Sequence, residues 1–319
     1  MAVPIRALGQ EIPAGDAFID ALVSQYRLSL LELKDRARQV LLRDKRKLTY
    51  GAKRARLLVA EVEGLLDQLD ANSAEWIAEN IPRFYKSGIK RATVAMDEVG
   101  FSGEFVSQPI LHQEAIAVLV NDIQDDLLAA TEHARRGFRR VLMKSQLSLA
   151  TDRAMSAEIV RGVIAGKARR EVSKGIGERL MEEYGTPTIR VGSKTYAIDD
   201  YAELVARTRT KEAHTAGTIN RTIEAGHDLV MISAHGAKDG CSYYEGKVFS
   251  ISGTDERYPP LNSIPRGGPP FHPNCRHSTM PFVEDLATGA ETRRAKGVPD
   301  GVLGKSMGEV EKIHRRAIK

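Results

Sequence analysis

The chain has 319 residues, 42% of them hydrophobic, so it is long enough for two or three domains with ordinary buried cores. Lys and Arg number 47 against 42 Asp and Glu, which gives a formal net charge of +5. Two cysteines exclude a disulfide-rich secreted scaffold, the N-terminus lacks the apolar core of a signal peptide, and the lack of any run of about 18 apolar residues argues against a membrane span. We expect a protein made in a reducing cytoplasm or in a particle assembled there.

The first half of the chain shows the apolar spacing of long α-helices. Stripes at helical spacing run from Phe18 to Leu33, from Leu58 to Leu69, from Ile116 to Val141 and from Met155 to Leu180. Such helices are marginal alone in water, so their stripes need partners that bury them. The sequence therefore predicts an elongated helical region over residues 1–145, which we expect to attach to a larger ring.

Individual residues indicate where these helices begin, break and pack. Asp16 is a candidate N-cap for the first helix, and Pro109 marks the start of the third. Segment 71–108 also looks helical, with a break expected at Pro82 because proline removes a helical hydrogen bond. Trp76, the single tryptophan, is expected to be a core anchor rather than a contact site.

Basic residues gather in two helical segments. Segment 34–56 holds ten basic and two acidic residues, and segment 133–144 carries a second basic face. Each is either a solvated helix face or a surface that attracts nucleic acid or an acidic protein. We expect contacts with DNA or an acidic partner, without sequence reading, at Arg43, Lys45, Arg46, Lys47, Arg139 and Arg140.

The second half changes character and predicts a small α+β domain over residues 146–284. A hairpin over 186–199 turns at Gly192, and a helix over about 200–225 ends at Gly226. Three strands follow, in the segments HDLVMIS, GKVFSIS and CRHSTMPF. A long Pro/Gly linker separates the last two, so it is either held in place or a contact arm. Residues 285–319 are expected to form a polar C-terminal tail.

Cysteine and histidine residues supply the chemistry of this domain. The segment FHPNCRHSTMPF packs His272, Cys275 and His277 together, and Cys241 and His235 lie upstream. Thiolate and imidazole are the preferred ligands of tetrahedral zinc, so Cys241, His272, Cys275 and His277 could form a structural metal site, with His235 as an alternative ligand. A thiolate nucleophile with a histidine base is a second interpretation. Buried cysteines with hydrogen-bonded histidines, and no metal, are a third.

Each of these interpretations shares one structural expectation. Cys241 and Cys275 stand near the two ends of the Pro/Gly linker. We therefore expect Cys241, His272, Cys275 and His277 to form a structural knot that pins the linker to the strands, with or without zinc. No catalytic residue is assigned, because phosphate-loop, serine-elbow and H-E-x-x-H patterns do not stand out.

The same residues carry a resemblance to a known family. The segments ISAHGAKDGCSYYEGKVFSISG, YPPL and HPNCRHSTMPF resemble the tailed-bacteriophage minor capsid proteins, which are related to the Mu F-type head morphogenesis proteins. The matching positions are His235, Cys241, Gly246, Lys247, Val248, Phe249, Asn274, Cys275, Arg276 and His277. The resemblance covers about residues 150–284 and includes Arg207, Thr208, Thr210 and Glu224; Lys238 departs from it, where Mu F-type relatives often carry a cysteine.

The resemblance implies a structural virion component rather than an enzyme. It implies a minor head protein inside the capsid, attached near the portal protein, with other head proteins and packaged DNA as neighbours and no membrane. Such a protein would act in head assembly and in DNA packaging or ejection. Two alternatives stay open: a Cys/His-dependent hydrolase or nuclease acting during infection, and a free-standing, sequence-independent DNA-binding protein.

Overall fold

The computed structural model describes residues 15–43, 51–101, 108–150, 188–191 and 194–318. These residues divide into two compact units. The helical unit comprises the described residues of Ala17–Trp76 and Gln124–Glu203, and the mixed unit comprises those of Ile77–Ile123 and Leu204–Lys319. The division differs from the predicted limit at residue 145, because three of the long helices contribute residues to both units. The fold class is α+β, as predicted.

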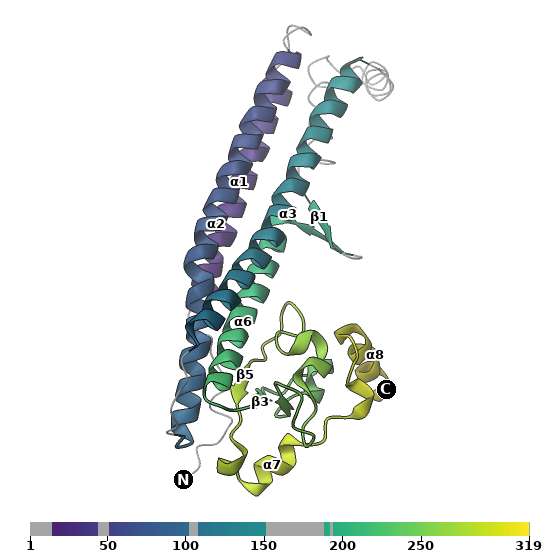
Figure 1. The fold of residues 1–319 in the computed structure, drawn as a ribbon. Helices are drawn as coiled ribbons and strands as arrows, with labels where there is room; N and C mark the ends of the chain where they lie inside the picture. Colours follow the sequence, from purple (N-terminus) through teal and green to yellow (C-terminus); the bar gives the residue numbers. More distant parts are fainter. Residues whose placement is uncertain (1–14, 44–50, 102–107, 151–187, 192–193, 319) are drawn as a thin grey trace. The chain divides into compact units, whose positions relative to one another are not determined.

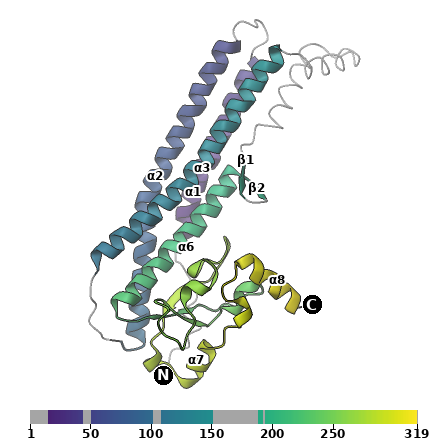
Figure 2. The same cartoon turned by 45° about the vertical axis from the view of Figure 1, so that its right-hand side comes forward.

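Three long helices form the helical unit. They are α1 (Gly15–Arg43), α2 (Gly51–Glu98) and α3 (Pro109–Ala150), and both views in Figures 1 and 2 show them side by side. Each buries a stripe of apolar side chains: Leu22, Tyr26 and Leu33 on α1, Val62, Leu66 and Leu69 on α2, and Leu127, Ala130 and Ala134 on α3. The spacing predicted all of these positions except Leu66, because it placed Leu65 in the stripe and the structure leaves Leu65 only half-buried.

The start of the first stripe needs a correction. Phe18 is 40% exposed, and Ile19 is buried in its place. Trp76 is buried, as predicted, and its indole Nε1 donates a hydrogen bond to the carbonyl oxygen of Phe18 at 2.8 Å. The backbone carbonyl of Phe18 therefore helps to anchor α1 to α2.

The break expected at Pro82 is absent, because α2 continues through it. Ile77, Ile81 and Tyr85 surround the proline in sequence and are buried in the mixed unit. A proline inside a helix costs about 3 kcal/mol, whereas burying each large side chain contributes about 1.5–3 kcal/mol. Packing of the neighbouring side chains therefore outweighs the lost hydrogen bond.

A hairpin leads into the next helix. Strand β1 (Thr188–Val191) pairs antiparallel with β2 (Lys194–Ala197), and α6 (Ile198–Glu224) follows directly. The helix ends as predicted at Gly226, whose φ is 76°, with hydrogen bonds from Gly226 N–H to the carbonyl of Ile223 and from His227 N–H to that of Thr222. The expected turn at Gly192 and the helix expected over 155–180 lie outside the described residues.

In the mixed unit, α6 packs against α2 with the two backbones in contact. A Cβ on Gly88 would lie 1.9 Å from the carbonyl oxygen of His214, and one on Gly217 would lie 2.1 Å from that of Tyr85. The Thr218 hydroxyl donates to the carbonyl of Gly88 at 3.2 Å. Glycine is required at both positions because a side chain would occupy the space of the facing backbone.

A polar network surrounds this crossing. Glu224 at the end of α6 accepts hydrogen bonds from His112 Nε2 at 2.8 Å, from the Gln108 backbone N–H at 2.8 Å and from Arg221 at 3.1 Å. The other ring nitrogen of His112 lies 2.7 Å from the Tyr85 hydroxyl. These bonds satisfy a buried carboxylate and tie α2, α3 and α6 together.

The remainder of the mixed unit is built on a three-stranded antiparallel sheet. Strand β3 (Leu229–Ile232) is central, with β4 (Val248–Ser250) and β5 (Thr279–Pro281) on either side. Both faces are buried: Val230, Ile232 and Phe249 join one core cluster, and Leu229, Met231 and Val248 join another. This explains why the predicted strand over HDLVMIS is apolar throughout rather than alternating.

The Pro/Gly linker is held in the core rather than free as an arm. It carries the 3-10 turns Leu261–Ser263 and Pro265–Gly267, and Pro260 forms a bridge with Ser250 of β4. Its apolar side chains are buried: Tyr258, Leu261, Ile264 and Phe271. The linker is therefore one wall of the sheet's core.

The polar tail expected over 285–319 is wrong, because this segment completes the fold. Helix α7 (Gly289–Ala295) buries Ala295 on one face of the sheet, and α8 (Met307–Ala317) buries Val310 on the other, together with Val302. Figures 1 and 2 show α7 and α8 on separate sides of the strands. Each face of the sheet needs an apolar cover, and these isolated residues supply it. Of the helices that the structure describes, none is both long and apolar enough to cross a membrane.

Candidate functional site

The cysteine and histidine residues lie close together at one end of the three-stranded sheet. Because β4 and β5 both run antiparallel to β3, the C-terminal end of β3 and the N-terminal ends of β4 and β5 lie at the same end of the sheet. The β3–β4 connection supplies His235 and Cys241, the latter on the 3-10 turn Gly240–Tyr243. The segment before β5 supplies His272, Cys275 and His277. All five predicted residues therefore lie in one region.

Three of them form a compact buried group. Cys241, Cys275 and His277 are 0%, 1% and 4% exposed, and their sulfur and nitrogen atoms all lie within 4.8 Å of one another. The His277 Nδ1 atom lies 3.4 Å from the Cys275 sulfur. Both cysteines are free thiols. The structure thus joins the β3–β4 connection to the end of the linker through these side chains.

Glu245 fixes the ring of His277 from the other side. One carboxylate oxygen of Glu245 lies 3.1 Å from His277 Nε2 and accepts the backbone N–H groups of His235 and Ala237, each at 2.9 Å. The ring of His235 lies against that of His277, with centroids 4.3 Å apart. With Nε2 held by a carboxylate, Nδ1 is the nitrogen that faces the two thiols.

His272 belongs to a neighbouring group that shares Cys241. His272 Nε2 lies 3.3 Å from a carboxylate oxygen of Asp239, and the other Asp239 oxygen accepts the backbone N–H of Cys241 at 3.0 Å. The ligand atoms of Asp239, Cys241 and His272 also lie within 4.8 Å of one another. A backbone bond from Cys275 N–H to the His272 carbonyl, at 2.9 Å, closes the H-x-x-C turn.

The charges of the buried group are coupled. The hydrogen bond with Cys241 is the main cause that lowers the pKa of Cys275, against the effect of burial, and the same bond together with burial raises the pKa of Cys241. Burial would lower the pKa of His277, but its hydrogen bonds and proximity to Cys275 and Glu245 raise it instead. Burial would likewise raise the pKa of Glu245, but hydrogen bonds from the backbone and from His277 lower it. The arrangement favours a thiolate at Cys275 beside a charged imidazole.

This geometry can serve a structural role more readily than a catalytic one. A Cys275–His277 pair has the side chains that a cysteine nucleophile requires. Cys275, however, is only 1% exposed and belongs to the same buried core cluster as Phe271 and Tyr244. Buried thiols and an imidazole in mutual contact are instead suited to linking loops or holding a metal ion.

The sequence analysis did not identify Glu245 or Asp239 as partners of these histidines. The segment EGKV that contains Glu245 stands out for its glycine and strand, not for the carboxylate. The position of the Glu245 carboxylate depends on hydrogen bonds from the backbone N–H groups of residues 235–237, and the direction of backbone N–H groups cannot be predicted from the sequence. Lys211 of α6, also missed, donates to the carbonyl of Cys275.

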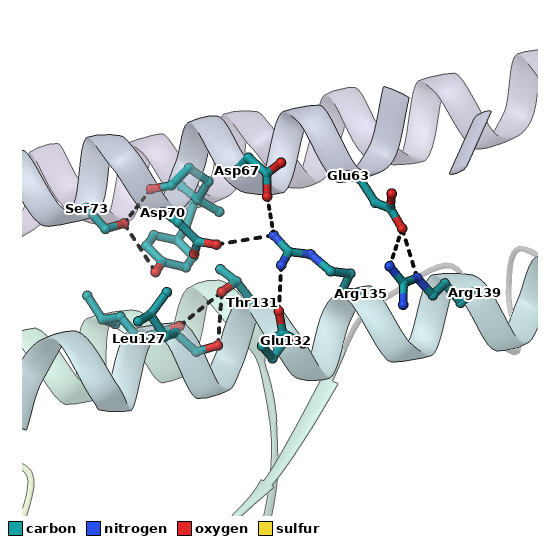
Figure 3. A network of polar contacts seen from close by, with 12 residues as sticks. Glu63, Asp67, Asp70, Ser73, Leu127, Thr131, Glu132, Arg135 and Arg139 are labelled. Atoms are coloured by element: carbon teal, nitrogen blue, oxygen red, sulfur yellow. Dashed lines mark hydrogen bonds and ion pairs between the residues drawn. The ribbon is translucent and has the colours of Figure 1, made fainter. Parts of the chain in front are cut away.

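The predicted basic contact residues are placed only in part. Figure 3 shows Arg139 of α3 directed at Glu63 of α2, with its Nε 2.8 Å from the carboxylate, and Arg135 directed at Asp67 and Asp70. The charge of Arg139 is therefore partly neutralised within the helical unit. The side chains of Arg43, Lys45, Arg46, Lys47 and Arg140 lie outside the described residues, so a contact with DNA stays a prediction.

Comparison with known proteins identifies the family. The family model for phage minor capsid protein 2 matches residues 121–300, which is more than half of the chain and includes α6, the sheet and the whole Cys/His cluster. Searches of curated proteins and of solved structures returned no match. The match bears out the resemblance seen in the sequence and assigns the chain to the structural proteins of phage particles. The chain belongs to the phage minor capsid protein 2 family.

Proposed function

We propose that the chain is a non-catalytic minor head protein that attaches to the portal inside the capsid and acts in head assembly and in DNA packaging or ejection. Family membership supports the coarser part, a structural phage protein associated with the virion. The observation that carries the non-catalytic part is the burial of Cys241, Cys275 and His277, the residues best suited to chemistry. Nucleophilic catalysis needs a reachable sulfur, whereas a structural link does not.

The helical unit supplies the attachment surface in this proposal. Leu28 and Leu31 on α1 are 67% and 61% exposed, although their neighbour Leu30 is buried in the unit. Residues three apart lie on the same side of a helix, so these two leucines form one apolar patch. Burying a leucine is worth about 1.5–3 kcal/mol, and a portal surface that covers the patch would supply this energy.

DNA is a neighbour rather than a specific ligand in this account. Arg139 and Arg135 are engaged with carboxylates of α2, so the described part of the basic face is closer to neutral than its sequence indicates. Contacts that do not read sequence depend on net positive charge. The account therefore assigns to segment 34–56 the larger share of any attraction to packaged DNA.

Co-purification with the portal protein tests the attachment. Full-length chain with Leu28→Glu and Leu31→Glu should lose portal binding, because two charges would be forced against an apolar contact. Leu286→Glu is a matched control, since Leu286 is also exposed but lies in the mixed unit. Loss of binding by the control alone, or unchanged binding by the double variant, would contradict the assigned surface.

A further inference from the structure

We infer that Cys241, Cys275 and His277 bind one structural divalent metal ion of the zinc type, with His272 as the fourth ligand. The ion would join the β3–β4 connection to the end of the Pro/Gly linker. This inference goes beyond the proposed function, because it holds whether or not the chain attaches to the portal. It selects His272 over His235, and it assigns Glu245 and Asp239 to the shell outside the ligands.

The spacing of the three buried ligand atoms fits a tetrahedral ion. Zinc–sulfur bonds of about 2.3 Å and zinc–nitrogen bonds of about 2.0–2.1 Å place neighbouring ligand atoms roughly 3.5–3.8 Å apart. The Cys275 sulfur and His277 Nδ1 are 3.4 Å apart, and both lie within 4.8 Å of the Cys241 sulfur. These separations are compatible with binding of all three atoms to one ion that draws them closer together.

The orientation of His277 is the second observation. A metal-binding histidine almost always donates its other ring nitrogen to a carboxylate or carbonyl, which sets the tautomer and aims the ligating nitrogen. Glu245 occupies that position at 3.1 Å from Nε2, and it is itself fixed by backbone N–H groups. The Nδ1 atom is thereby aimed at the two sulfurs.

The fourth ligand comes from the same tight turn as Cys275. Residues 272–275 form a turn closed by a backbone hydrogen bond, so His272 and Cys275 approach the edge of the sheet together. The ligand atoms of His272, Cys241 and Asp239 lie within 4.8 Å of one another, so among the described residues His272 joins the buried group through one of its two sulfurs and would have to move closer to Cys275 and His277 to complete the site. Asp239 contacts His272 in the way that Glu245 contacts His277, and so repeats the carboxylate–histidine arrangement.

His235 lies near the cluster but faces a different group. Among the described residues, His235 groups with Glu245 and His277 and not with either sulfur. Its Nδ1 atom lies 3.7 Å from a carboxylate oxygen of Glu245, and its ring lies against that of His277 at an interplanar angle of 38°. The geometry therefore gives His235, which the sequence offered as an alternative ligand, a packing role.

The charge balance of the site also favours an ion. On binding, each thiol loses its proton to solvent, and two thiolates neutralise the two charges of the ion, while both histidines bind as neutral imidazoles. A site with no net charge suits a core that excludes water. Two thiolates together with imidazoles favour zinc over magnesium or calcium, which prefer oxygen ligands.

Cobalt titration of the full-length chain under reducing conditions tests the inference. Metal-free protein should bind an equimolar amount of Co²⁺ and develop the thiolate charge-transfer and visible bands of a tetrahedral site, and Zn²⁺ should displace it. Cys275→Ser and His277→Ala should abolish these bands. His272→Ala should weaken binding at least about tenfold, and the matched control His235→Ala should bind like the wild type.

Several outcomes would overturn the inference. These are wild-type protein that binds neither Co²⁺ nor Zn²⁺, a cobalt spectrum without thiolate bands, or a Cys241–Cys275 disulfide in the freshly isolated protein. Equal loss in His235→Ala and His272→Ala would overturn the assigned ligand set. Because the wild-type spectrum decides the main point, a variant that fails to fold does not leave the question open.

Discussion

Replacing Gly88 with alanine tests whether α2 and α6 are held in backbone contact. The new Cβ would lie 1.9 Å from the carbonyl oxygen of His214, in a space that no real Cβ occupies. The two backbones would have to separate by roughly 1 Å, since main-chain atoms cannot rotate away as a flexible side chain can. The separation would also stretch the hydrogen bond from Thr218 to the Gly88 carbonyl.

The expected cost follows from these contacts. Overpacking a close contact costs about 1–3 kcal/mol, and a weakened hydrogen bond adds up to about 1 kcal/mol. Alanine regains about 1 kcal/mol of helix propensity. The expected net loss is therefore about 1–3 kcal/mol. Gly64→Ala in the same helix has nothing within 4 Å of its Cβ, so it should be neutral or stabilise by up to about 1 kcal/mol.

Urea unfolding followed by circular dichroism gives the free energies, and hydrogen exchange shows where the effect lies. Gly88→Ala should lower the unfolding free energy and speed amide exchange in the second half of α2 and in α6. Gly64→Ala should do neither. If both variants changed stability by the same amount, the helices would not be in the contact described, and the reasoning from Cβ distances would be refuted.

Three further predictions concern other parts of the chain. Burial would raise the pKa of Glu224, but hydrogen bonds from Gln108, Arg221 and His112 lower it below its ordinary 4.5. The stability that the Glu224 carboxylate contributes is therefore present above pH 4.5 and is lost as the pH falls through the lowered pKa. Glu224→Gln should cost about 1–3 kcal/mol of unfolding free energy at neutral pH and progressively less in acid, whereas Glu114→Gln at an exposed position should cost nothing measurable by thermal unfolding. Val310→Asp should destabilise the mixed unit by about 3 kcal/mol or more, because it buries an unpaired charge, and limited proteolysis should then cut residues 285–318 faster than in the wild type. Equally rapid cleavage of this segment in the wild type would instead support the tail interpretation. Neutralising Arg43, Lys45, Arg46 and Lys47 in segment 34–56 should weaken binding to every DNA duplex about equally. Arg139→Gln should have a smaller effect on DNA binding, because Arg139 already pairs with Glu63. A loss of binding confined to one DNA sequence would contradict this prediction.

Much of the fold could be predicted from the sequence, because the patterns that determine it involve only a few neighbouring residues. The stripe from Leu22 to Leu33 and the glycine that ends α6 depend on helical period and on a positive φ at Gly226, and both are properties of a few neighbouring residues. The fully apolar strand over residues 229–232 likewise predicted burial on both faces. These features need no knowledge of distant contacts.

The errors arose where distant contacts override local preference. Pro82 is a helix breaker by local chemistry, yet buried neighbours on both sides carry the helix through it. Val302 and Val310 are isolated apolar residues in a polar stretch, so only the face of the sheet that they cover reveals their role. Phe18 and Ile19 lie four and three residues before Leu22, so both fit the helical spacing, and the structure buries Ile19.

The residues of the candidate site could be predicted from the sequence, but the role of each residue within the site could not. Two cysteines and nearby histidines mark the cluster, and the structure brings Cys241, Cys275 and His277 together. The choice between His235 and His272 depends on which side of Glu245 and Asp239 each ring occupies. Those carboxylates act through backbone N–H groups and ring nitrogens, and sequence spacing does not encode such directions.

Cross-linking mass spectrometry of purified particles tests the central claim most directly. The particles are those of the phage that encodes the chain. The account predicts that the chain is present in few copies and that residues of α1 around Leu28 and Leu31 cross-link to the portal protein. A chain that is missing from purified particles, or one whose α1 cross-links only to the major capsid protein, would contradict it.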